Sequence, residues 1–205
     1  MLRTIALFLA SAALALPGTV ISVTGSNPGG INLGGIGAVS WTQSGAFSGV
    51  SISAVMTNSF GTGQSIAFHA YLTDAIGPGA TVADEIDSTA FSIAPGFNQT
   101  VNLFNGLSLG PGTYFLVISS DLGATGAGGW SVTTSSPTVT TGLGVTRNAD
   151  RGSNGAAALY PPATNIPVLT GGSLLYSVTA SDVPEPATTA LIACGLAIIA
   201  VRRRG

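Results

Sequence analysis

Short segments in which apolar and polar residues alternate recur along the middle of this chain. A period of two residues is typical of strands with one buried face, and β-branched and aromatic residues favour the same structure. The segments with this character are GVSISAVMTN (49–58), SIAFHAYLTD (65–74), GTYFLVISS (112–120), GGWSVTT (128–134) and GSLLYSVTA (172–180). GTYFLVISS is apolar on both faces, which predicts a covered central strand. The sequence therefore predicts an all-β fold.

Turn-forming residues separate these segments and predict how the strands are joined. Glycine allows positive backbone angles, and proline presets a turn. The groups are Gly77-Pro78-Gly79, Pro95-Gly96, Gly110-Pro111-Gly112, Gly128-Gly129 and Gly171-Gly172. Several short strands with frequent turns predict a β-sandwich, of the jelly-roll or immunoglobulin-like type. Residues 138–167 are less regular and predict a long, partly ordered connection.

Composition supports one domain with a core of its own. Hydrophobic residues make up 45% of the 205 residues, which is too many for a disordered chain. Only 7% of residues are charged, and the sole cysteine is Cys194, so we expect no disulfide within the chain. Between residues 16 and 182 there are two arginines and seven acidic residues, a formal net charge of −5. A nucleic-acid-binding protein needs a basic face, so we expect no nucleic-acid partner.

The N-terminal segment MLRTIALFLASAALALPG predicts export. It combines one early charge, Arg3, with an uncharged run and the small residues Ala13 and Ala15. These are the parts of a secretory signal peptide. We therefore predict a signal peptide at residues 1–15 and an ectodomain at residues 16–182.

The C-terminal segment VPEPATTALIACGLAIIAVRRRG, residues 183–205, predicts a short membrane anchor. Residues 187–201 carry no charge, but a helix of 15 residues is only about 22 Å long, against a hydrocarbon core of ~30 Å. Arg202, Arg203 and Arg204 stop the segment and keep its end in the cytoplasm. Pro184 and Pro186 stiffen the chain around Glu185 and present this carboxylate outside the membrane.

This order of Pro184-Glu185-Pro186, apolar helix and arginine cluster resembles the PEP-CTERM sorting signal of Gram-negative bacteria. The resemblance covers about the last 23 residues. It implies that an exosortase, a membrane-embedded cysteine peptidase, recognises Pro184, Glu185 and Pro186 and cuts nearby. It also implies temporary anchoring in the inner membrane, release or transfer to the cell surface, and an association with exopolysaccharide and biofilm. The catalytic cysteine would belong to the exosortase, not to Cys194.

Two patterns suggest catalysis or metal binding, and neither has the context that it needs. GLSLG, residues 106–110, has the letters of a nucleophile elbow around Ser108, but a turn and a strand follow where a helix is required. The only histidine, His69, lies in a predicted strand and is expected to be a surface side chain. Asp84, Glu85 and Asp87 are close together, but their spacing fits no EF-hand loop, so a solvated loop is the favoured interpretation. We expect no catalytic residues, no metal site and no cofactor.

Aromatic residues give the body its one candidate ligand site. Trp41 and Trp130 are possible ligand-binding residues, with Tyr114 beside them, because large aromatic faces bind sugar rings. The main prediction is a non-enzymatic, exported protein of the surface or extracellular matrix that an exosortase cleaves. The alternative is a module that binds exopolysaccharide, with calcium as a possible aid.

Overall fold

The computed structural model describes residues 18–25, 28–30, 35–59, 63–120, 128–134, 136–154 and 157–181. These residues form two antiparallel sheets, which confirms the predicted all-β fold. The predicted signal peptide (1–15) and sorting segment (183–205) lie outside the described residues. Within the described part of the chain, no helix is long and apolar enough to span a membrane. The finer assignment to a jelly-roll or immunoglobulin-like sandwich stays a prediction.

The first sheet has the strand order β10-β1-β14-β4-β9-β13, with β2 also paired to β9 and β7 also paired to β4. The bounds of its strands are β1 Gly18–Thr24, β2 Pro28–Gly30, β4 Phe47–Asn58, β7 Gly96–Leu109, β9 Gly128–Thr133, β10 Thr138–Thr141, β13 Ser173–Leu174 and β14 Tyr176–Ala180.

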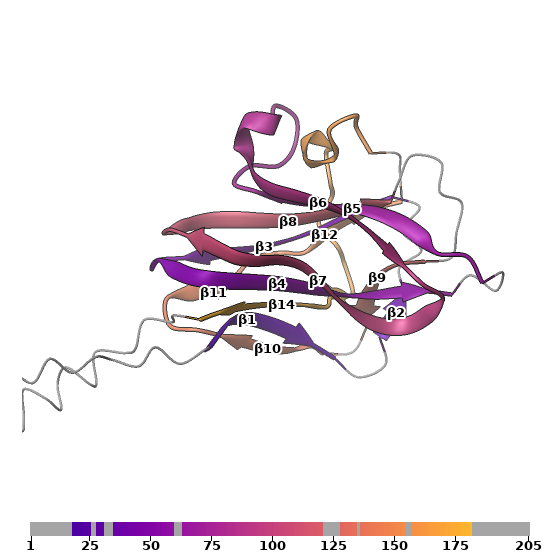
Figure 1. The fold of residues 1–205 in the computed structure, drawn as a ribbon, viewed down its shortest axis with the longest axis horizontal. Helices are drawn as coiled ribbons and strands as arrows, with labels where there is room; N and C mark the ends of the chain where they lie inside the picture. The colour runs from indigo at the N-terminus through magenta and orange to yellow at the C-terminus, as the bar shows by residue number, and fades with distance from the viewer. Residues whose placement is uncertain are drawn as a thin grey trace, which may run out of the picture.

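The second sheet has the order β11-β3-β8-β5-β6, with β12 also paired to β3. The bounds are β3 Ile36–Gln43, β5 Ile66–Thr73, β6 Glu85–Ile93, β8 Gly112–Ser120, β11 Val145–Arg147 and β12 Arg151–Ser153. Two short 3-10 helices, η1 Val82–Asp84 and η2 Pro161–Ala163, complete the described elements. Figure 1 shows two layers, with β8, β5 and β6 above β4, β14, β1 and β10.

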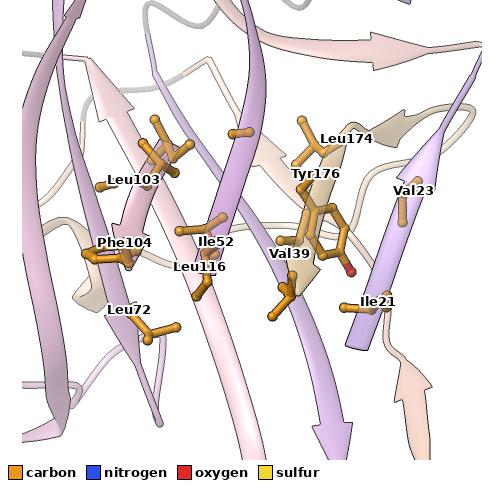
Figure 2. Close-up of a cluster of buried hydrophobic side chains, with 14 of the residues drawn as sticks. Ile21, Val23, Val39, Ile52, Leu72, Leu103, Phe104, Leu116, Leu174 and Tyr176 are labelled. Atoms are coloured by element: carbon orange, nitrogen blue, oxygen red, sulfur yellow. The ribbon is translucent and has the colours of Figure 1, made fainter. Parts of the chain in front are cut away.

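The core lies between the sheets and follows from the alternation in the sequence. On β5, Ile66, Phe68, Ala70 and Leu72 are buried, and the residues between them are half-buried. β4 buries Val50, Ile52, Ala54 and Met56 in the same way. Figure 2 shows the cluster, in which Val39, Leu72 and Leu116 of the second sheet meet residues of the first sheet such as Ile52, Phe104 and Tyr176. Burial of these side chains is the main favourable contribution to folding.

A second, smaller cluster covers the outer face of the second sheet. Ile36, Ala38, Val117 and Ile166 are buried there. β8, which is apolar on both faces, is therefore covered on both faces, as predicted from its sequence. The smaller cluster also corrects the prediction for residues 138–167: this segment holds β10, β11, β12 and η2, and its later part packs on the sheet.

The pair Gly128-Gly129 begins β9 and is buried, as the predicted strand GGWSVTT requires, and does not form the turn that was also predicted for it. A side chain at position 128 would lie 2.9 Å from the backbone oxygen of Thr57, on the neighbouring strand β4. Glycine is needed here for close packing, not for a change of chain direction.

Candidate functional site

The chain enters and leaves the described body at one end. Gly18, the first residue of β1, is paired with Ala180, the last residue of β14. Three turns lie at the same end and are tied to one another and to the two chain ends by the hydrogen bonds described below. We call this region the exit end; its surface residues are 18–19, 44–46, 48, 110–111, 142–144 and 181. The predicted sorting segment begins directly beyond it.

Ser181 is fixed at the exit end. Its backbone N–H and its hydroxyl both donate to the carbonyl oxygen of Ser48, each at 3.1 Å. Gly49 makes room for it, because a Cβ at position 49 would overlap the Ser181 hydroxyl and lie 2.9 Å from its Cβ. Gly49 also has a φ of +57°, a conformation in which glycine carries no steric penalty. Ser181, the last described residue before the sorting segment, is thus held by specific contacts with Ser48 and Gly49.

Gln43 joins two of the three turns. Its side-chain Nε2 donates to the carbonyl oxygens of Gly45, Leu109 and Gly110, at 3.2, 3.1 and 2.8 Å. Its Oε1 accepts a hydrogen bond from the indole N–H of Trp41 at 3.0 Å. The Gln43 side chain therefore connects the turn between β3 and β4 with the turn between β7 and β8.

The third turn, between β10 and β11, is joined to the other parts of the exit end by its backbone. The Gly142 N–H donates to Val20 at 2.8 Å, and the Ser44 N–H donates to the Gly144 carbonyl at 3.0 Å. Leu143, at the tip of this turn, is 68% exposed. The surface residues of the exit end include no charged and no aromatic side chain. The result is a rigid, uncharged surface with one projecting leucine.

A hollow of about 470 Å³ lies beside the exit end. Its lining includes Ser108, Pro111, Tyr114 and Asp74. Burial raises the pKa of the Tyr114 hydroxyl, and the nearby Asp74 carboxylate raises it further. The Tyr114 hydroxyl donates to the Gly110 carbonyl at 2.8 Å, so it holds the adjacent turn in place.

The structure does not bring Ser108 and His69 together. Ser108 lies in β7, and β8 follows after a turn, so the strand–serine–helix geometry of a nucleophile elbow is not formed. His69 is on β5, paired with Ala90 and Ser119, and is not part of the lining of the hollow. Its ring lies 6.3 Å from that of Tyr71.

The acidic residues 84, 85 and 87 do not form the expected loop: Asp84 is the last residue of η1, and Glu85 and Asp87 lie in β6. Asp84 caps η1 by accepting a hydrogen bond from the Thr81 N–H at 2.7 Å, and Asp87 accepts one from the Ser88 N–H at 2.8 Å. Among the residues that the structure describes, no group of three His, Cys, Asp or Glu side chains is placed to hold a metal ion.

Both tryptophans are core residues, which corrects their assignment as possible ligand-binding residues. Trp41 and Trp130 are each 0% exposed, so neither offers a ring face to a sugar. The indole N–H of Trp130 donates to the Leu175 carbonyl at 2.7 Å, and that of Trp41 donates to Gln43 as described above. A buried tryptophan needs such a partner for its polar group. All six residues of β9, the strand that contains Trp130, are buried.

A part-buried ion pair that was not predicted from the sequence links the two sheets. Asp150 accepts hydrogen bonds from Arg147 of β11 at 2.6 Å and from the backbone N–H of Leu174 of β13 at 2.8 Å. Burial raises the pKa of the Asp150 carboxyl, although Arg147 acts in the opposite direction. Burial also raises the pKa of the nearby Tyr176 hydroxyl, and the Asp150 charge adds to this effect. The link between the sheets could not be predicted locally, because Leu174 is 24 residues away from Asp150 in the sequence.

Comparison with known proteins identifies the segment beyond the exit end. Residues 182–204 match the family model of the PEP-CTERM protein-sorting motif. No curated protein and no solved structure gives a significant match to the chain. The matched range contains Pro184, Glu185, Pro186 and the three arginines, and it begins one residue after Ser181. The motif implies an exported protein that an exosortase targets, with membrane-associated sorting to the cell surface. The chain is thus a protein that carries the PEP-CTERM protein-sorting motif at residues 182–204.

Proposed function

We propose that this chain is a non-enzymatic protein of the bacterial surface or extracellular matrix, held briefly in the inner membrane and then processed by an exosortase. Pro184, Glu185 and Pro186 act as the recognition residues, and Arg202 to Arg204 hold the tail end in the cytoplasm. The observation that carries the proposal is the sorting motif at residues 182–204, placed directly after a folded β body. A secretory signal at residues 1–15 would deliver the body to the outside.

The chemistry of the segment supports this order of events. As a helix, the fifteen uncharged residues 187–201 would be shorter than the ~30 Å hydrocarbon core, which suits a temporary anchor. Prolines on both sides of Glu185 favour an extended backbone, the form in which peptidases bind their substrates. After cleavage, the body would be free of the membrane or joined to a surface polymer.

A substitution at Glu185 tests the proposal. In a host with a matching exosortase, Glu185→Ala should leave uncleaved chain in the membrane fraction, and intact-mass measurement should find the terminal arginines still present. Asp182→Ala is the matched control, because it removes a carboxylate at the start of the same segment without touching the proline-bracketed residue. Processing of the Glu185→Ala chain at the wild-type rate would refute recognition at this motif.

The absence of enzymatic activity is also part of the proposal. It is supported by the separation of Ser108 from His69, which leaves the serine without a histidine base in the hollow. The alternative function, binding of exopolysaccharide with calcium as a possible aid, receives no support from the buried tryptophans. It would have to use other side chains of the body.

A further inference from the structure

The exit end has the features of a protein-binding surface and lies next to the sorting motif. We infer that it is a docking surface for the peptidase that processes the tail, so that the enzyme contacts the folded body as well as the Pro-Glu-Pro element. This inference rests on the proposed function and adds a second contact to it.

Chain length forces the enzyme close to the body. Ser181 is fixed to Ser48 by two hydrogen bonds, and only two residues separate it from Pro184. An extended chain advances at most ~3.6 Å per residue, so Pro184 lies within about 11 Å of Ser181. That distance is similar to the 10–12 Å diameter of a single helix with its side chains. An enzyme that encloses Pro184 to Pro186 therefore meets the exit end.

The surface chemistry of the exit end favours a protein partner over lipid. The centre of a protein interface is depleted of charged residues, and the uncharged exit end with its projecting Leu143 meets this condition. Surfaces that bind membranes combine apolar residues with basic ones. The surface residues of the exit end include no basic residue, and Asp74 in the adjacent hollow would oppose binding to anionic lipid.

The exit end is also rigid before any partner arrives. Hydrogen bonds fix the turns relative to one another: those of the Gln43 side chain, those of Gly142 with Val20 and of Ser44 with Gly144, and those of Ser181 with Ser48. A preorganised surface loses little conformational entropy when it binds. Leu143 and Pro111, at the tips of two different turns, are the exposed residues best placed to contact the enzyme.

The test compares two matched substitutions in the full chain, expressed in a host with the exosortase. Leu143→Arg should lower the rate of tail removal by about tenfold, the effect of losing roughly 1.4 kcal/mol of binding energy. Leu159→Arg is the control, because Leu159 is 97% exposed and lies just before η2 rather than at the exit end. It should be processed at the wild-type rate. Pro111→Arg, on a different turn, should reproduce the Leu143→Arg result and so excludes a local folding defect.

The outcomes separate this inference from the proposed function. If Glu185→Ala blocks processing while Leu143→Arg and Pro111→Arg do not slow it, docking at the exit end is refuted and sorting stands. If Glu185→Ala has no effect, the sorting proposal itself is refuted. Binding of the released body to vesicles of phosphatidylethanolamine and phosphatidylglycerol, abolished by Leu143→Arg, would assign the surface to lipid and overturn the inference.

Discussion

The connection made by Gln43 between two turns of the exit end gives a prediction whose size follows from its contacts. Replacement by methionine keeps the length of the side chain but removes both polar atoms. The Trp41 indole N–H would then be buried at 0% exposure without an acceptor. One buried group left unsatisfied costs about 1–3 kcal/mol, and loss of the bonds to the Leu109 and Gly110 carbonyls adds about 1 kcal/mol. We expect Gln43→Met to lower the free energy of unfolding by about 2–4 kcal/mol.

A double-mutant cycle with Trp41→Phe isolates the indole contact. Phenylalanine has no N–H to leave unsatisfied, so Gln43→Met should cost about 1 kcal/mol less in the Trp41→Phe background than in the wild type. Urea unfolding of residues 16–182, followed by circular dichroism, measures all four proteins. A loss below about 0.5 kcal/mol for Gln43→Met would show that these hydrogen bonds do not hold the turns together, and strict additivity in the cycle would show that the indole contact does not contribute to the loss.

Three further predictions concern packing, the part-buried ion pair and pH. Gly49→Ala and Gly106→Ala both place alanine at a positive φ, which costs about 1–2 kcal/mol. Only the alanine at position 49 would overlap Ser181, so Gly49→Ala should lower the free energy of unfolding in urea by about 1 kcal/mol more than Gly106→Ala. Equal losses would contradict the contacts described for Ser181. Asp150→Ala should lower stability by about 1–3 kcal/mol, because it leaves the buried Leu174 N–H without an acceptor and the partly exposed Arg147 without its partner; a loss below about 0.5 kcal/mol in the same assay would contradict this reasoning. Burial raises the pKa of Tyr160 from 10.0 to about 12. Above pH 10 the unfolded chain therefore loses a proton that the folded chain keeps, and the urea midpoint should fall as the pH rises from 10 to 12, less steeply in Tyr160→Phe.

Local sequence pattern was sufficient to find the strands with strong alternation. β4, β5 and β8 were predicted because apolar residues occupy every second position or both faces. β6 was missed because its half-buried positions begin with the polar residues Glu85, Asp87 and Thr89, so apolar and polar residues do not alternate in the sequence. β1 was missed because its residues directly follow the apolar run of the predicted signal peptide, from which they cannot be separated by composition.

The features of the exit end could not be predicted, because they join residues that are far apart in the sequence. Gly49 contacts Ser181, and Gln43 contacts Leu109 and Gly110. Nothing near any one of these residues indicates its partner. The burial of Trp130 was not predicted for a related reason: a strand pattern shows which residues share a face, but not whether both faces are covered. By contrast, the sorting motif is a continuous stretch of sequence and was identified directly.

The position of β14 determines how the body bears tension. β14 lies between β1 and β4 and is hydrogen-bonded to both, and the tail continues directly from its last residue. Interstrand bonds in antiparallel sheets run perpendicular to the strands. A pull on the tail along β14 therefore shears both rows of bonds at once and does not peel them apart singly. A body suspended by this strand would resist drag from flowing liquid better than one suspended by an outer strand.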